Sequence, residues 1–146
     1  IEAYESGKAP AFELYALGLG HKHVPEIMSY GRLTTRPLFV PSVGNFRQGM
    51  LVSIPLVLDA LPGRPTAQDL DAAYARHYAG ATHVRRVATP ADGRLDALAL
   101  NGTDDMEVFA IANDAHGHAL LVARLDNLGK GAAGAAIQNL DLMMGE

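Results

Sequence analysis

Residues 20–27, with the sequence GHKHVPEI, hold the densest group of ionisable side chains in this chain. His21 and His23 are two positions apart, so on an extended segment both imidazole rings point to the same side. Glu26 follows three residues after His23, in the first turn of a helix that Pro25 is suited to begin. A carboxylate can hold an imidazole in one tautomer, and an imidazole held in this way is a candidate acid or base near neutral pH.

Two other interpretations of these histidines stay open. Both rings can belong to a solvated surface loop that has no chemical role. The pattern His-x-His can also supply two nitrogen ligands to a metal ion. However, the chain has no cysteine, and Glu26 is the only acidic residue close by. We therefore expect no metal site.

Two glycine-containing loops have residues that suit an anion. Arg47 lies in the polar loop 44–49, GNFRQG, and its planar guanidinium can form paired hydrogen bonds with a phosphate or carboxylate. The alternative is an ordinary turn with a solvated arginine. Residues 126–136, DNLGKGAAGAA, place small residues and backbone N–H groups at the start of a helix, where an anion or a planar ring can approach. These small residues would equally suit tight helix packing.

Hydrophobic periodicity predicts the elements that position these residues. Helical spacing favours helices at 25–32, 66–79 and 131–144, the second with a capping box formed by Thr66 and Asp69. Pro55 lies within the expected strand 50–58, and a proline there predicts an edge strand or a bulged strand. The expected strands 107–112 and 119–125 are predicted to form a hairpin around the turn at residues 113–117. Strands are expected at 11–17, 38–43, 50–58, 84–88, 107–112 and 119–125. Short turns join many of them, which predicts an α+β fold with a mainly antiparallel mixed sheet and helices packed on one face.

Composition limits the class of protein. The chain has 146 residues, of which 49% are hydrophobic and 19% charged, so we expect a single domain over residues 1–146. A net charge of -4 without a basic block argues against nucleic acid and lipid headgroups as partners. The sequence has neither an apolar run of roughly 20 residues nor the pattern of a secretory signal. We therefore expect a soluble, cytoplasmic protein that makes no membrane contact.

The sequence does not have the glycine-rich motifs of nucleotide-binding folds in the positions that these folds require. The pattern G-x-x-x-x-G-K-[ST] does not occur, and no G-x-G-x-x-G directly follows a predicted strand. The chain is therefore not expected to have a nucleotide-binding fold of its own. The absence of cysteine also excludes disulfides, thiolate metal ligands and a cysteine nucleophile within these residues.

Three segments resemble one enzyme family. GHKHVPEI resembles the H-[RK]-H-x-P-E-I signature of N-acetyl-gamma-glutamyl-phosphate reductases. GNFRQGMLVSIPL resembles the strand that follows it, and DNLGKGAAGAAIQNLDLMMG resembles the family's C-terminal helix signature. Their order and spacing also agree, and the resemblance covers nearly the whole chain, with residues 61–101 contributing least. The last segment alone would also resemble aspartate-semialdehyde dehydrogenases.

The resemblance implies a fold and an activity. Enzymes of this family have a Rossmann domain that binds NADP, and a catalytic and oligomerisation domain similar to the second domain of glyceraldehyde-3-phosphate dehydrogenase. This chain looks like the second domain alone, so we expect an excised piece that is inactive by itself. The whole enzyme would reduce N-acetyl-gamma-glutamyl phosphate to the semialdehyde in arginine biosynthesis, through a cysteine located upstream.

The resemblance also suggests roles for individual residues. His21 would be the catalytic acid or base, and His23 and Glu26 would orient it and contact the substrate. Arg47 would bind an anionic group of this small acyl phosphate. The nicotinamide end of NADP would be approached by Lys130, Gly131, Gly134 and Asn139.

The chain is expected to self-associate, and two alternative functions stay open. We expect a homodimer or homotetramer. An aspartate-semialdehyde dehydrogenase domain is one alternative, and HKHVPEI argues against it. The other is a binding or assembly module without catalytic activity, which would need no cysteine.

Overall fold

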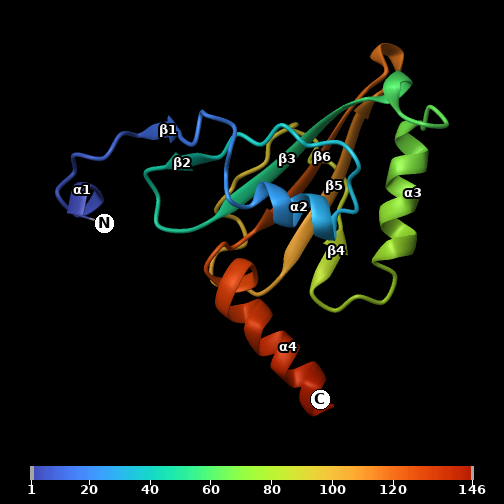
Figure 1. Cartoon of the computed structure of the whole chain (residues 1–146). Coiled ribbons are helices and arrows are strands. Elements are labelled where there is room, and N and C mark those ends of the chain that lie inside the picture. Colours follow the sequence, from blue (N-terminus) through green and yellow to red (C-terminus); the bar gives the residue numbers. More distant parts are fainter. Residues whose placement is uncertain (1, 146) are drawn as a thin grey trace. The chain divides into compact units, whose positions relative to one another are not determined.

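The computed structural model describes residues 2–145 (Figure 1). The chain divides into two compact units, with the boundary between Arg47 and Gln48. Each unit has its own β-sheet, of two strands in the first and four strands in the second. The single domain expected over residues 1–146 stays a prediction.

The first unit contains two short helices and two short strands. These are α1 (Glu2–Glu5), β1 (Phe12–Leu14), α2 (Val24–Tyr30) and β2 (Ser42–Gly44). Strands β1 and β2 are antiparallel, with Glu13 opposite Val43. Helix α2 has Pro25 in its first turn and Gly31 as its C-cap, which confirms the expected helix at this place.

Both strands of the first unit are shorter than the sequence pattern predicted. Residues 11–17 form a strand only at Phe12–Leu14, because the chain turns at Ala16 and Leu19, whose φ angles are +52° and +56°. Residues 38–43 were expected to be extended and paired, but β2 begins at Ser42. Proline removes a backbone donor, and Pro37 and Pro41 flank the unpaired stretch.

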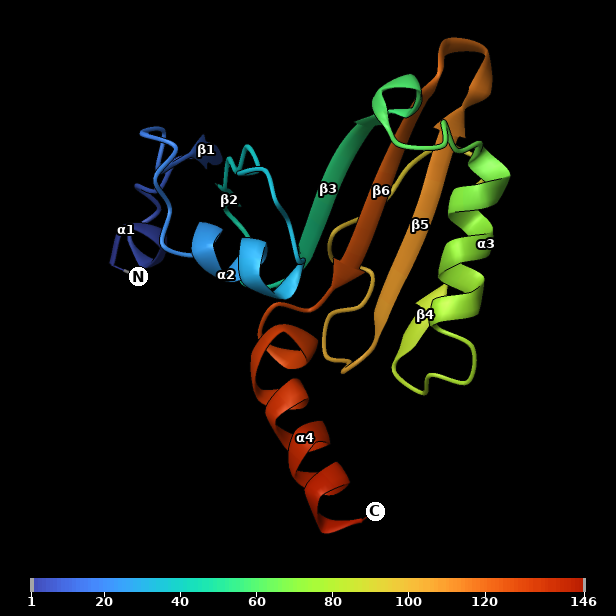
Figure 2. The same cartoon turned by 45° about the vertical axis from the view of Figure 1, so that its right-hand side comes forward.

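The second unit is built on a four-stranded sheet with the order β3-β6-β5-β4 (Figure 2). Its strands are β3 (Met50–Val57), β4 (Val84–Arg86), β5 (Met106–Asn113) and β6 (His118–Leu125). Strand β6 is antiparallel to both β3 and β5, whereas β4 is parallel to β5. The short helices η1 (Leu58–Ala60) and η2 (Asp114–His116) follow β3 and β5. The arrangement confirms the α+β class and the mainly antiparallel mixed sheet.

Helix α3 (Ala67–His77) covers one face of this sheet beside β5 (Figure 2). It begins with the expected capping box, in which the Thr66 hydroxyl accepts from the Asp69 backbone N–H and the Asp69 carboxylate accepts from Thr66. Asp71 on the helix pairs with Arg86 of β4 at 2.8 Å. Arg86 lies opposite Val108, so α3 lies on the sheet face that carries Val108.

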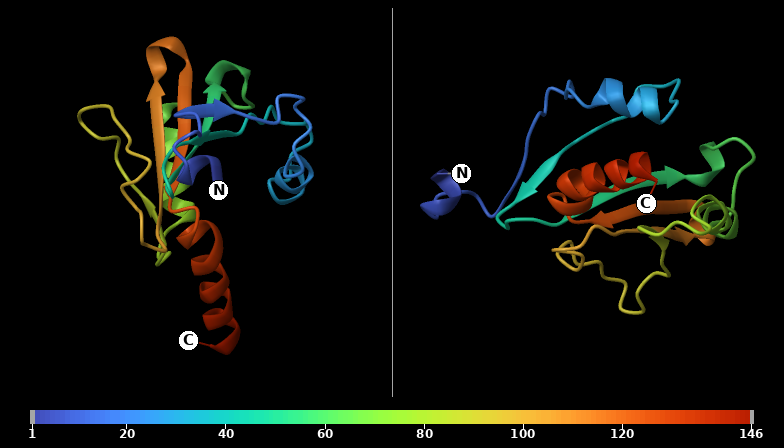
Figure 3. Two further views of the ribbon diagram at one scale, coloured as in Figure 1. Left: turned by 90° about the vertical axis from the view of Figure 1, so that its left-hand side faces the viewer. Right: turned by 90° about the horizontal axis from the view of Figure 1, so that it is seen from below.

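The opposite face holds the most deeply buried side chain. Phe109 of β5 is fully buried and lies opposite the buried Val122 of β6. The Arg124 guanidinium is 5.3 Å from the centre of the Phe109 ring and donates a hydrogen bond to the backbone oxygen of Asp96. The loop after β4 therefore crosses this face (Figure 3, left), and the core extends to both sides of β5 and β6.

Strand β3 forms an edge of the sheet, as Pro55 predicted. The backbone N–H of Leu58 continues the ladder by donating to Gly117 at 2.7 Å. Since donors alternate along a strand, the nitrogen of Pro55 points away from β6, toward the outer edge. Val52 and Ile54 lie on the face that carries α3, and they are 40% and 50% exposed because the helix packs beside β5.

The chain then leaves the sheet through a π-helical turn, η3 (Gly129–Ala133), and enters α4 (Gly134–Met144). This confirms the expected C-terminal helix. Whereas α3 lies on the sheet, α4 extends past its end (Figures 1 and 2). No helix within residues 2–145 has the length and apolar character required to cross a membrane.

Candidate functional site

His21 is held by the main chain of the second histidine in the motif. The backbone N–H of His23 donates to Nδ1 of His21 at 3.2 Å. An imidazole nitrogen that accepts a hydrogen bond carries no proton, so the neutral His21 ring has its proton on Nε2. This nitrogen can therefore donate a hydrogen bond to a reacting group.

Aromatic side chains surround the His21 ring. The rings of His23, Phe39 and Tyr15 meet it edge-on at centroid distances of 4.7, 5.2 and 6.0 Å. His21 is half-buried and lines an open hollow of about 240 Å³ together with Ala16, Gly18 and Gly20. The ring thus has aromatic neighbours and also borders an open hollow.

The turn before His21 has an unusual backbone. Ala16 and Leu19 both adopt the left-handed conformation, which costs an L-residue with a side chain about 1 kcal/mol or more. The Arg36 guanidinium donates to the backbone oxygen of Leu19 at 3.0 Å and so supports this turn from 17 residues away. Arg36 and Phe39 could not be selected from the sequence, because each acts through a long-range contact that no local pattern reveals.

Glu26 and Arg47 are exposed. Within residues 2–145, Glu26 forms no ion pair or side-chain hydrogen bond with either histidine. The structure therefore differs from the expected carboxylate–imidazole pair, and the tautomer of His21 is set by a backbone N–H instead. The Arg47 guanidinium has no carboxylate partner in the same described range, so it is free to bind an anion.

A buried carboxylate organises the second group of predicted residues, in the other unit. Asp126 is 1% exposed. One of its oxygens accepts from the Gln48 side chain at 2.6 Å and from the backbone N–H of Gly102 at 2.8 Å. The other oxygen accepts from the backbone N–H groups of Leu128 at 2.8 Å and Gly129 at 3.1 Å. Asp126 thereby joins three separate segments of the chain.

These hydrogen bonds favour the ionised form of Asp126. The backbone N–H groups of Gly102 and Leu128 are the main reason that the pKa of this carboxyl falls to about 2. Asp126 was not among the residues predicted from the sequence. Its position directly after an apolar strand and two residues before a backbone donor is typical of an Asx turn, which is the signal that would have found it.

The glycines after Asp126 permit close packing. A Cβ atom on Gly134 would lie 1.9 Å from a carboxylate oxygen of Asp104, and one on Gly129 would lie 2.5 Å from the backbone oxygen of Thr103. Gly131 is exposed and donates its N–H to the backbone oxygen of Asp126. The packing interpretation therefore explains Gly129 and Gly134, and a cofactor contact of Gly134 stays a prediction.

Residues 129–134, GKGAAG, do have the spacing G-x-G-x-x-G and open a helix. The dinucleotide fingerprint belongs to a parallel βαβ unit. Here the preceding strand, β6, is antiparallel to both of its neighbours. The motif therefore does not form the phosphate-binding turn of a Rossmann fold.

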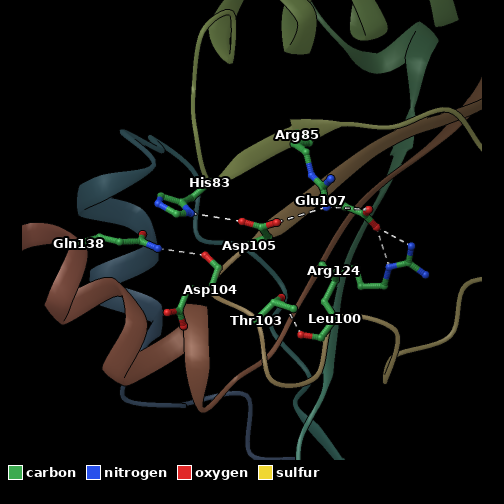
Figure 4. A network of polar contacts seen from close by, with 9 residues as sticks. All are labelled: His83, Arg85, Leu100, Thr103, Asp104, Asp105, Glu107, Arg124 and Gln138. Carbon is green, nitrogen blue, oxygen red and sulfur yellow. Dashed lines mark hydrogen bonds and ion pairs between the residues drawn. The ribbon is translucent and has the colours of Figure 1, made fainter.

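Lys130 and Asn139 complete the predicted group. Lys130 is half-buried, and its ammonium donates to the side chain of Gln138. Asn139 is exposed on α4. Gln138, which the sequence analysis did not select, also donates to the backbone oxygen of Asp104 at 3.1 Å (Figure 4).

A chain of charged side chains crosses β4, β5 and β6 near this group (Figure 4). His83 contacts Asp105 at 3.2 Å, and Arg85 contacts both Asp105 and Glu107 at 3.3 and 3.5 Å. Glu107 in turn accepts two hydrogen bonds from Arg124. All these carboxylates have cationic partners, which indicates a role in joining the strands.

Comparison with known proteins identifies relatives of this chain. Residues 3–127 match the family model described as "Semialdehyde dehydrogenase, dimerisation domain". N-acetyl-gamma-glutamyl-phosphate reductase 2 of Pseudomonas putida is 51% identical over 99% of the chain and 48% of its own length. The reductases of Burkholderia lata and Allorhizobium ampelinum are 49% and 52% identical over 99% and 90% of the chain. The chain spans about half the length of these curated relatives.

Proposed function

The chain belongs to the family of semialdehyde dehydrogenase dimerisation domains, and on this basis we propose that it forms one domain of an N-acetyl-gamma-glutamyl-phosphate reductase. The observation that carries the proposal is 51% identity to such a reductase over 99% of the chain. The enzyme would reduce N-acetyl-gamma-glutamyl phosphate to N-acetylglutamate semialdehyde, with release of phosphate, in arginine biosynthesis in the cytoplasm.

His21 would act on the reacting sulfur and oxygen atoms. The chain has no cysteine, so the thiol nucleophile would come from outside these residues. With Nδ1 occupied by the His23 backbone N–H, the Nε2–H group of His21 can donate a hydrogen bond. Such a donor stabilises a thiolate before its attack and the oxyanion that the attack creates, because both carry negative charge close to the ring.

Exposed polar groups of the first unit would bind the substrate. The Arg47 guanidinium has the geometry for a carboxylate or phosphate and no partner of its own within residues 2–145. The His23 ring lies against His21, and the exposed His23 and Glu26 would contact the polar atoms of the acyl chain.

The second unit would contribute to a nicotinamide cofactor, which we take to be NADP. When bound, this cofactor supplies the hydride that reduces the acyl group. Lys130 offers a cation without a carboxylate partner in the described part of the chain, and the exposed Gly131 and Asn139 leave room for a planar ring. These residues would contact one end of the cofactor, and the rest of its site would lie outside this chain.

Two copies would associate through the sheet of the second unit. Val52 and Ile54 expose apolar side chains on the part of the sheet face that α3 leaves uncovered. Exposed apolar sheet surface is stabilised when a second copy covers it. A homodimer or a homotetramer would bury these residues.

The test is an assay of the full-length natural protein with N-acetyl-gamma-glutamyl phosphate and NADPH, followed by NADPH absorbance. We expect NADPH oxidation that depends on the acyl phosphate and is much slower with aspartyl phosphate. A preference for aspartyl phosphate would favour an aspartate-semialdehyde dehydrogenase. Folded protein without either activity would favour a binding or assembly module. The 146-residue chain alone should be inactive, since it has no cysteine.

A further inference from the structure

Lys130 carries the only charge in the segment 129–134. Its Nζ atom donates to Oε1 of Gln138 at 2.5 Å. Among residues 2–145, no carboxylate oxygen lies within the 4.0 Å of this ammonium that defines an ion pair. The partner of Lys130 is therefore a neutral amide, which fixes the position of the positive charge without cancelling it.

The second half of the Gln138 amide fixes its orientation. Nε2 donates to the backbone oxygen of Asp104 at 3.1 Å (Figure 4). A reversed amide would place its NH₂ group against the ammonium and its oxygen against a carbonyl, which would lose both hydrogen bonds. Only one orientation satisfies both partners, and in that orientation Oε1 faces Lys130.

The support for Gln138 is itself closely packed. The start of α4 lies so near residues 103–104 that a Cβ on Gly134 would overlap the Asp104 carboxylate. This close approach brings Gln138, which is eight residues after Lys130, within reach of the Asp104 carbonyl. The lysine, the amide and the loop thus form one connected arrangement.

We propose that Gln138 is a positioning residue. It holds the Lys130 ammonium in place without neutralising its positive charge, so that the ammonium can bind a phosphate oxyanion of the cofactor or of the acyl phosphate. The inference rests on the proposed function, because that function gives Lys130 an anionic ligand. A glutamate at position 138 would cancel the charge, whereas a leucine would leave the ammonium unheld. A neutral hydrogen-bond acceptor with the length of glutamine holds the ammonium and leaves its charge in place.

The first test measures Lys130 without any enzyme assay. The full-length natural protein and its Gln138→Leu variant are treated with a low concentration of acetic anhydride, and acetylation of each lysine is followed by mass spectrometry. Lys8 and Lys22, the other lysines of this chain, are internal references. Loss of the hydrogen bond should raise the Lys130 acetylation rate several-fold relative to both. An unchanged relative rate would overturn the proposal.

The second test separates binding from turnover. Gln138→Glu should raise KM for one phosphate-bearing ligand about tenfold and leave kcat within about twofold, because the new carboxylate neutralises the cation that binds the ligand. Gln138→Leu should raise the same KM by a smaller factor. Ala75→Glu adds a negative charge at an exposed position of α3, outside the proposed binding residues, and should change neither constant.

A rise in the KM for NADPH would identify the oxyanion as a phosphate of the cofactor. A rise in the KM for the acyl phosphate would identify it as the phosphate of the substrate. If neither KM rises in Gln138→Glu while the wild-type protein is active, the proposal is wrong and the proposed function stands. If the wild-type protein does not reduce the acyl phosphate, the proposed function fails, and the acetylation result alone decides whether Gln138 holds Lys130.

Discussion

The side chain of Gln48 donates a 2.6 Å hydrogen bond to the carboxylate of Asp126, which is 78 residues later in the sequence. Gly102 donates to the same oxygen. One carboxylate therefore joins the residues before β3, the turn before β5 and the segment after β6. Since this carboxylate is 1% exposed, its hydrogen bonds are protected from water, and the segment that carries Lys130 begins from a fixed point.

The stability of the second unit should depend on pH through Asp126. Its pKa is about 2 in the folded protein, against an ordinary value of 3.8. A lowered folded-state pKa adds stability that is present above the unfolded value and is lost as the pH falls toward the folded value. The denaturant midpoint of the wild-type protein should therefore fall between about pH 5 and pH 2, and it should fall less in Asp126→Asn.

The control for this experiment is Glu13→Gln, which removes one negative charge from the exposed strand β1. It should keep the wild-type dependence on pH. If the denaturant midpoints of the wild-type protein and Asp126→Asn fall equally as the pH is lowered, Asp126 is not the cause of this pH dependence.

Replacement of His21 should reduce turnover without unfolding the protein. In the full-length protein, His21→Ala should lower kcat by a factor of roughly 10² to 10⁴, the usual effect of removing a positioned acid or base. Steady-state kinetics gives the factor, and circular dichroism checks the fold. Turnover within a few-fold of the wild type would remove His21 from the mechanism.

His23 should act on His21 through its backbone. His23→Ala keeps the N–H group that His21 accepts from, so it should cost less activity than His21→Ala. His23→Pro removes this N–H, and the φ angle of −77° at this residue suits proline. Because proline also restricts Lys22 within the turn 21–24, circular dichroism must show that the variant is folded. It should therefore lower kcat more than His23→Ala does. The opposite order of the two variants would contradict the tautomer assigned to His21.

Gly134→Ala should reveal whether this glycine is needed for packing. Alanine is favoured over glycine in a helix by about 1 kcal/mol, but its Cβ would lie 1.9 Å from the Asp104 carboxylate. We expect no stabilisation from Gly134→Ala alone, and a gain of less than about 1 kcal/mol when Asp104→Ala is already present, because the Cβ atom of residue 104 remains 3.0 Å away. Denaturant titration of the four proteins measures the coupling, and additive effects would contradict the packing role.

The pair Glu107 and Arg124 should contribute to stability in the core of the sheet. Their side chains are 12% and 14% exposed, and removing Arg124 leaves the poorly solvated Glu107 carboxylate with only the 3.5 Å contact to Arg85. Arg124→Met should destabilise the protein by about 3 kcal/mol. The double variant with Glu107→Gln should be more stable than Arg124→Met, because the carboxylate that lost its hydrogen-bonded cation is then removed, while Arg85 keeps Asp105 as its partner. Thermal unfolding can test this order.

Association should depend on the apolar surface beside β3. Ile54→Lys places a charge on a side chain that is 50% exposed, so the folded subunit should tolerate it while a contact between copies should not. Sedimentation velocity at micromolar concentration should show a dimer or larger species for the wild-type protein and a monomer for the variant. Glu13→Gln is again a suitable control. Monomeric wild-type protein across a tenfold dilution would contradict the predicted contact.

Local signals in the sequence predicted most elements of the second unit. Thr66 and Asp69 revealed the start of α3, Pro55 revealed an edge strand, and the alternation on both sides of residues 113–117 revealed the hairpin. These signals lie within a few residues of the structure that they specify. In the first unit, the expected strand at 38–43 begins only at Ser42, since prolines at both ends of the stretch remove backbone donors.

The candidate site was harder to predict because its supporting contacts are distant in sequence. His21 and Lys130 were selected by residue type, but the bonds that hold them come from a backbone N–H and from Gln138. Asp126 and Gln48 are 78 residues apart, so no periodicity links them. Glycine is also ambiguous, because close approach of a ligand and close approach of another segment require the same small residue.

Pro55 has a consequence for the behaviour of the protein at high concentration. An eight-residue edge strand offers a row of free backbone donors and acceptors, which can recruit further strands into an open-ended polymer. The Pro55 nitrogen points toward this edge and has no hydrogen to give, so the row of donors is interrupted near its middle. Growth strand by strand along β3 is thereby discouraged, whereas the association proposed for the sheet's face would not use these backbone donors.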